Sequence, residues 1–205
     1  MVLDNRRWSS KAVLAVLAAV LLLSPAWGQS SLAQLRAEVE ANPGSVTAWV
    51  ALGNAQYEQG DYDQARESFL EAIALDYRSG DAHYGLGIAQ FSRGDYQAAL
   101  FEFNEVTRLY PERFDGHFNR AVTLARLRRP ADAAEAFRAA LQQAEPEASA
   151  EDRVHALLGL AGQLELTENW GEAADAYAEA LELEPANAED ILRRGQALQK
   201  AGRGL

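Results

Sequence analysis

The sequence repeats itself at a fixed interval, and this periodicity limits the possible folds more than any other feature. The segment QGDYDQARESFLEAIALDY (59–77) returns as RGDYQAALFEFNEVTRLYP (93–111). Phe69 recurs at the same interval as Phe103 and again as Phe137. A regular repeat of this length indicates structural units that stack on their neighbours and bury a shared core between them.

Each unit contains two helical patterns. In the first unit, residues 46–59 carry a stripe of apolar and small side chains at helical spacing. Gly60 then interrupts the chain, and Asp61 is placed to cap a second helix. The small residue Gly53 allows the paired helices to approach closely, and Phe69 fills the space beyond it. Good helix formers dominate the composition and alternating Val, Ile and Thr runs are missing, so the sequence predicts an all-α fold.

These units resemble tetratricopeptide repeats, whose pattern is W-x2-L-G-x2-Y, then A-x3-F, then A and P. The residues of the first unit that match the pattern are Trp49, Leu52, Gly53, Ala65, Phe69 and Ala72. The unit departs from the pattern at Tyr57, one residue late for the tyrosine, and at Tyr77, where proline is usual. The resemblance implies a right-handed α-solenoid of helix-turn-helix repeats.

The same resemblance divides the chain into units. A tetratricopeptide-repeat domain is expected over 29–205. Its repeats are expected at 46–79, 80–113, 114–147 and 154–187, its N-terminal capping helix at 31–42 and its C-terminal capping helix at 188–201. After the third repeat the register shifts, in an acidic stretch that the sequence predicts as a surface loop. The polar residues of the last helix fit a capping role, because the end of a repeat stack needs a soluble face.

The N-terminal segment, residues 1–28, has the layout of a secretory signal peptide. Basic residues precede the apolar run at 12–23, and small residues at Ala26 and Gly28 form a cleavage site. A run of this length falls short of the roughly 20 residues that span a bilayer. We therefore expect removal of residues 1–28 and export to the periplasm, cell envelope or exterior, with an uncleaved membrane anchor as the alternative.

The charge and the residue types argue against several functions. A formal net charge of −11 opposes binding to nucleic acid or anionic lipid. The chain has no cysteine, and it shows no nucleophile elbow, phosphate-binding loop or H-E-x-x-H motif. The sequence thus predicts no catalytic residue, no cofactor and no metal, and a protein that is not an enzyme.

The first helices of the repeats carry the candidate binding site. The resemblance implies that they line a concave groove that receives a peptide or helix of a protein partner. The predicted groove residues are Val50, Asn54, Tyr57, Tyr84, Ile88, Phe91, Phe118, Asn119 and Val122. The same strip continues through Ala125, Leu158, Gly162 and Glu165. A second interpretation is that these side chains only pack against the next repeat.

Three other motifs receive plainer interpretations. The RGD of residues 93–95 occupies the inter-helix turn that Gly60 and Asp61 occupy in the preceding unit, so adhesion is not needed to explain it. The Asp-x-His pairs that include His83 and His117 could suggest metal ligands, but residues two apart point to different sides of a helix. Relatives that bind an acidic chaperone peptide use basic and amide residues on the first helices. This chain has Val50 and Gly85 at such sites, so the sequence does not support that kind of peptide binding.

The sequence therefore predicts an exported, non-catalytic scaffold. It would bind an apolar-anchored peptide or helix of a partner, with aromatic anchors oriented by Asn54 and Asn119. The alternatives are a membrane-tethered scaffold, a metal-binding protein that uses Asp81, His83, Asp115 and His117, and a homo-oligomer that closes its own groove.

Overall fold

The structure is a computed structural model that describes residues 32–143, 148–184 and 188–202, and the predicted signal peptide lies outside these ranges. Within them the chain forms helices and no strands. The helices are α2 (Leu32–Ala41), α3 (Val46–Glu58), α4 (Tyr62–Leu75), α5 (Gly80–Arg93), α6 (Tyr96–Leu109), α7 (Phe114–Arg126), α8 (Pro130–Gln142), α9 (Ala150–Leu166), α10 (Trp170–Leu183) and α11 (Ala188–Lys200). The all-α prediction is confirmed.

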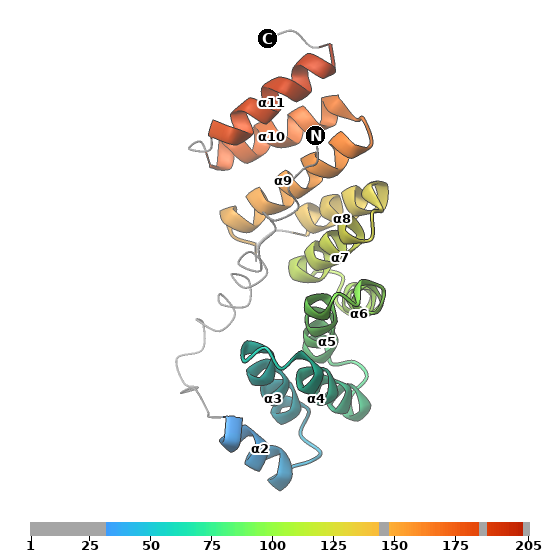
Figure 1. The fold of residues 1–205 in the computed structure, drawn as a ribbon, viewed down its shortest axis with the longest axis vertical. Coiled ribbons are helices and arrows are strands. Elements are labelled where there is room, and N and C mark those ends of the chain that lie inside the picture. Colours follow the sequence, from blue (N-terminus) through green and yellow to red (C-terminus); the bar gives the residue numbers. More distant parts are fainter. Residues whose placement is uncertain (1–31, 144–147, 185–187, 203–205) are drawn as a thin grey trace.

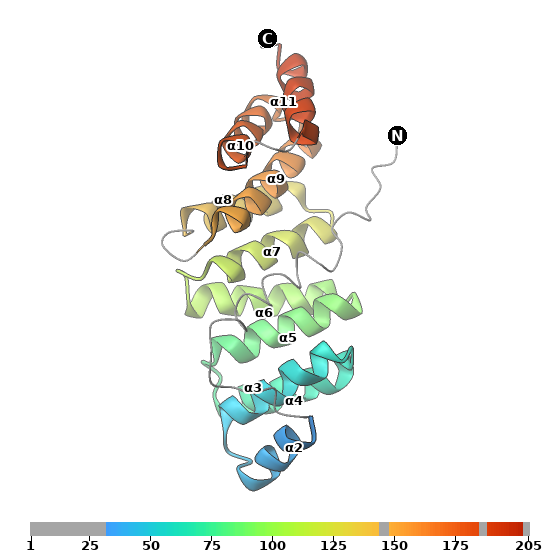
Figure 2. The same cartoon turned by 90° about the vertical axis from the view of Figure 1, so that its left-hand side faces the viewer.

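The helices form one elongated stack. They follow one another along the long axis from α2 at one end to α11 at the other (Figures 1 and 2). Each helix packs mainly on the helices directly before and after it in the sequence, so the contacts are local. The first helices of the hairpins are α3, α5, α7 and α9, and the second helices are α4, α6, α8 and α10. This is the arrangement of a repeat protein, in which each unit buries its apolar face on its neighbours.

Phenylalanines of the second helices sit against glycines of the first helices. A Cβ atom built on Gly53 would lie 2.7 Å from the ring of Phe69, and one on Gly85 of the next hairpin would lie 2.4 Å from the same ring. Gly87 meets Phe103 in the same way at 2.8 Å. These contacts are closer than real side chains tolerate, so a Cβ atom at Gly53, Gly85 or Gly87 would force the phenylalanine ring to move.

Serine hydroxyls cap three of the first helices. The Oγ atoms of Ser45, Ser79 and Ser149 each accept a hydrogen bond from a backbone N–H of the first helical turn. The cap predicted at Asp61 is wrong: the residue stands at the N-terminus of α4 but its side chain makes no capping bond. At Ser149 the cap is reciprocal with Asp152, so α9 begins at Ala150, within the segment predicted as a loop.

A ring nitrogen links each of the first three units to the loop before it. The side-chain N–H groups of Trp49, His83 and His117 donate to the carbonyls of Pro43, Tyr77 and Pro111, each at 2.9 Å. The donors occupy equivalent positions in successive repeats, as do the acceptors. This recurring bond explains the two aligned histidines structurally, because the ring replaces the indole of the first unit.

The tripeptide Arg93–Asp95 forms the turn between α5 and α6. Gly94 has φ +87°, which favours glycine, as Gly60 does at φ +83° in the preceding turn. The guanidinium of Arg93 pairs with Asp63 at 2.8 Å and with Asp95 at 3.5 Å. Each of its three residues therefore has a structural role at this turn.

No helix among the described residues has the length and apolarity that crossing a membrane requires.

The equivalent turns of the third and fourth units hold non-glycine residues in the left-handed region. Arg128 has φ 56° and Glu168 has φ 60°. We expect Arg128→Gly and Glu168→Gly each to raise the free energy of unfolding by about 0.5–1 kcal/mol, because glycine adopts this conformation without the steric cost of a Cβ. Urea denaturation measures the effect. Gln143→Gly, at φ −92°, is the control; equal stabilisation by the control would contradict the explanation.

Candidate functional site

The structure buries five of the nine predicted groove residues. Each is less than a tenth exposed, and they are Tyr84, Ile88, Phe118, Asn119 and Val122. The other four, Val50, Asn54, Tyr57 and Phe91, are partly exposed. The expectation of an open apolar strip is therefore wrong for the middle of the row, where these residues pack against the neighbouring repeat.

Polar and aromatic neighbours cover Tyr84. Its hydroxyl accepts a hydrogen bond from Nδ2 of Asn119 at 3.1 Å, and the guanidinium of Arg113 lies 5.3 Å from its ring centroid. Asn119 also donates to the carbonyl of Asp115 at 2.9 Å. Burial raises the pKa of the Tyr84 hydroxyl far above its ordinary value, so the group stays neutral. Tyr84 and Asn119 thus join two repeats and leave no free anchor.

Phe118 is enclosed by other rings. Its centroid lies 5.7 Å from that of Phe114 in a stacked arrangement and 5.8 Å from that of Phe137 in an edge arrangement. Farther along the row, Arg126 lies over the half-buried ring of Phe91 at 5.8 Å. Tyr84 and Phe118 are therefore fully engaged within the chain, and Arg126 covers part of the Phe91 ring.

The inner strip of α9 is more open. Leu158 and Gly162, both in the predicted strip, are partly exposed, and a Cβ atom on Gly162 would meet no atom within 4 Å. One turn beyond Gly162, Leu166 is 60% exposed. Because i and i+4 positions share a helix face, these three residues form one apolar strip. We call Leu158, Gly162 and Leu166 the α9 strip.

Sequence reasoning missed two exposed leucines. Leu166 occupies the position that Ser92 and Arg126 occupy in the two preceding first helices. Ser92 contacts the inner residue Tyr57, and Arg126 contacts the inner residue Phe91. Leu192 repeats the position of Leu158 in the following unit and is 62% exposed on α11. Extending the inner strip by one further position along each helix would have found Leu166.

The four metal-site candidates engage other partners. Nδ1 of His83 lies 2.7 Å from Oε2 of Glu102, while Asp81 and Asp115 both accept from Arg113. His117 bonds the Pro111 carbonyl. Within the described part of the chain, no group of three His, Asp or Glu side chains is arranged to hold a metal ion. These contacts explain all four residues as links within a hairpin or between neighbouring hairpins and their loops.

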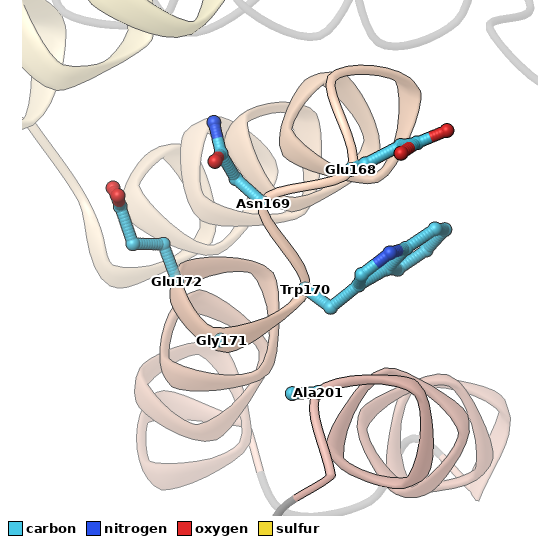
Figure 3. A pocket seen from close by; sticks show the side chains of 6 residues that line it. All are labelled: Glu168, Asn169, Trp170, Gly171, Glu172 and Ala201. Carbon is cyan, nitrogen blue, oxygen red and sulfur yellow. The ribbon is translucent and has the colours of Figure 1, made fainter.

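A surface hollow of about 350 Å³ lies where α9 turns into α10. Its lining residues are Glu168, Asn169, Trp170, Gly171, Glu172 and Ala201. The indole of Trp170 lies between Glu168 and the ribbon of α11 (Figure 3). Nζ of Lys200 lies 3.9 Å from the ring centroid, and Glu172 pairs with Arg138. The hollow's aromatic face is therefore taken by a cation of the chain itself.

Comparison with a family model decides the classification. The tetratricopeptide repeat model matches residues 29–76, 50–111 and 94–149, which together exceed half of the chain. The chain belongs to the tetratricopeptide repeat family. Members of this family are scaffolds for protein–protein interactions and are typically non-catalytic. No curated protein sequence matches the chain.

Solved tetratricopeptide repeat structures share the fold. YrrB, described as a TPR protein with an unusual peptide-binding site, has a TM-score of 0.71 at 19% identity and covers 82% of this chain and 84% of its own. PilF of Pseudomonas aeruginosa has a TM-score of 0.70 at 20% identity, with coverage of 98% and 87%. MamA from Desulfovibrio magneticus RS-1 has a TM-score of 0.66 at 18% identity, with coverage of 77% and 86%. At these identities the likeness extends to the solenoid fold alone.

Proposed function

We propose that this tetratricopeptide repeat protein is an exported scaffold that binds an apolar-anchored segment of a partner protein along its first helices. The α9 strip is the main contact. The partly exposed residues Val50, Asn54, Tyr57 and Phe91 extend the contact toward the other end of the row. The activity is binding without chemistry, and the chain uses no cofactor.

The observation that carries this proposal is the unfilled space at Gly162. Glycine inside a helix costs about 0.5–1 kcal/mol relative to alanine. At Gly53, Gly85 and Gly87 a phenylalanine ring requires the glycine, but at Gly162 no neighbouring atom does. Gly162 therefore leaves open helix surface between Leu158 and Leu166, here called the socket, which a bulky apolar side chain from outside the chain can cover.

Exposed apolar side chains beside the socket supply the binding energy. Leu166 is 60% exposed, and burial of apolar surface contributes roughly 25 cal/mol per Å². Adjacent exposed apolar side chains on one helix face are typical of an interaction site. A peptide or an amphipathic helix with a central large apolar residue fits such a strip.

Export is supported by the charged, apolar and small-residue segments of residues 1–28. Intact-mass measurement of the protein from its native host should give a chain that begins at Gln29. A full-length chain recovered with the membrane fraction would instead favour the tethered scaffold.

Site-specific photo-crosslinking tests the binding surface. A photoreactive amino acid at Leu166 should give a discrete adduct with a partner protein in the native host. The same amino acid at Glu135, an exposed position on α8, is the control and should give none. Equal adducts at both positions, or none at Leu166, would refute the α9 strip as the contact.

A further inference from the structure

Two exposed large apolar side chains of the second helices lie at the joint between α4 and α6, whereas Leu75 and Leu183 stand at helix C-termini. Phe101 on α6 is 58% exposed and Leu70 on α4 is 41% exposed. In register with Phe101, the other second helices carry the charged residues Glu67, Glu135 and Asp175. An exposed phenylalanine at a position that is otherwise acidic needs an explanation, because it contributes little to the core.

Leu70 stands where two other joints have a polar link. Arg36 donates to Gln64 at 3.0 Å between α2 and α4, and Arg138 pairs with Glu172 between α8 and α10. The positions one repeat after Arg36 and Gln64 hold Leu70 and Ala98. By repeat equivalence, the joint between α4 and α6 therefore has two apolar residues where a polar contact joins α2 to α4 and α8 to α10.

Repeat equivalence places these residues on one outer surface of the stack. Ala98 is exposed, and Phe101 follows it by one helical turn, so both lie on one face of α6. We call Leu70, Ala98 and Phe101 the outer apolar patch. It lies on the second helices, whereas the α9 strip lies on a first helix. Adjacent apolar residues on an exposed surface mark an interaction site more strongly than scattered ones.

Two exposed carboxylates flank Leu70 on α4, together with the partly buried Arg66 one turn before it. Glu67 and Glu71 are exposed and lie one turn before and one residue after Leu70. Neither makes an ion pair with another described residue, whereas Asp63 pairs with Arg93. Carboxylates beside an apolar contact favour a partner of opposite charge, in a chain whose formal net charge is −11.

We propose that the outer apolar patch is a second docking site, for a segment of a partner protein that presents a large apolar side chain flanked by lysine or arginine. The apolar side chain covers Phe101 and Leu70, and the basic residues pair with Glu67 and Glu71. With the α9 strip, the chain then has two separate binding surfaces and can hold two proteins together.

Selection from a peptide library tests this site without knowledge of the natural partner. A displayed library of random peptides of about 16 residues, long enough for a short helix, is selected against the full chain. The selected peptides should contain an aromatic or large aliphatic residue with neighbouring lysine or arginine. In fluorescence anisotropy, Leu70→Gln with Phe101→Gln should weaken these peptides about tenfold or more, since anchors dominate interface energies.

Matched variants separate the contribution of the acidic residues from that of the apolar contact. Glu67→Lys with Glu71→Lys should weaken the same peptides about tenfold, because the rim charge is reversed. Leu183→Gln, at an exposed leucine of α10, and Gly162→Trp, in the α9 strip, should leave their affinity unchanged. If the α9 strip proves not to be a binding site, the proposal for the outer apolar patch therefore still stands. Circular dichroism should show every variant folded, because all of these side chains are exposed or meet open space.

Three outcomes would overturn the proposal. The first is a selection with no enriched family, or families that bind the Leu70→Gln, Phe101→Gln variant equally well. The second is binding that the Glu67→Lys, Glu71→Lys variant leaves unchanged. The third is a concentration-dependent dimer that the Leu70→Gln, Phe101→Gln variant abolishes, which would make a second copy of this chain the occupant.

Discussion

Replacing Phe69 with alanine should lower the free energy of unfolding by about 3–5 kcal/mol, the range for removing a buried phenylalanine. Phe69 is 1% exposed and stands between α3 and α5, where it faces Gly53 and Gly85. The helices cannot close the space, because each is held by its own hairpin. Urea denaturation followed by circular dichroism measures the loss.

Two comparisons test the packing explanation. Leu70→Ala changes the next residue, which is 41% exposed, and should cost less than about 0.5 kcal/mol. Gly85→Ala should destabilise the wild type by about 1–3 kcal/mol through overpacking. In the Phe69→Ala background the same change should be neutral or stabilising, since its methyl group enters the vacated space. Additive effects would show that Phe69 and Gly85 do not share one site.

Replacing Glu102 with alanine should cost about 3 kcal/mol near pH 6, because it leaves His83 without its counter-charge. His83 is 1% exposed, and Glu102 is 8% exposed. The His83 ring lies between Oε2 of Glu102 at 2.7 Å and the carbonyl of Tyr77 at 2.9 Å. Both partners are acceptors when Glu102 is ionised, so both ring nitrogens carry hydrogen and His83 is a cation.

The pH dependence follows from the raised pKa of His83. Burial by itself lowers this pKa, but the hydrogen bonds to Glu102 and to the Tyr77 carbonyl, with the charges of Glu102 and Glu105, outweigh it. Stability from the pair is therefore complete below the unfolded pKa of about 6.5 and is lost as the pH rises through the higher folded value. The difference in the free energy of unfolding between wild type and Glu102→Ala should become smaller from pH 6 to pH 9.

His117 provides the matched control. Its Nε2 bonds the Pro111 carbonyl as His83 bonds Tyr77, but its Nδ1 has no partner, and Ala136 stands where Glu102 stands one unit earlier. His117→Gln should thus cost less than His83→Gln at pH 6. If the difference in the free energy of unfolding between wild type and Glu102→Ala stays constant from pH 6 to pH 9, the buried ion pair is disproved.

The repeat made most of the fold predictable from the sequence. Phe69, Phe103 and Phe137 recur with glycine partners, and side chains that must interlock leave a periodic signature that a single sequence displays. The helix ends were less accessible. Asp61 and Ser45 both have good capping side chains, but only Ser45, with an extended ψ of 106°, makes the bond, whereas Asp61 has a ψ of 62°.

Exposure along the first helices could not be derived from the periodicity. Tyr84 and Leu158 hold the same position in their repeats, yet Tyr84 is buried and Leu158 is partly exposed. The difference arises from neighbours in the next repeat: Asn119 and Arg113 cover Tyr84. The repeat period identifies equivalent positions, but the side chains that cover them differ from one repeat to the next.

The comparison of Gly162→Ala with Gly162→Trp tests the α9 strip most directly. Both variants should fold, and Gly162→Ala should gain about 0.5–1 kcal/mol of stability, because alanine favours the helix and its Cβ meets no atom. The deciding measurement is the affinity, by titration calorimetry, of the partner crosslinked at Leu166. The tryptophan should weaken this affinity about tenfold or more, since it fills the socket. An affinity equal to that of the wild type would contradict the account, because the partner would then bind without using Gly162.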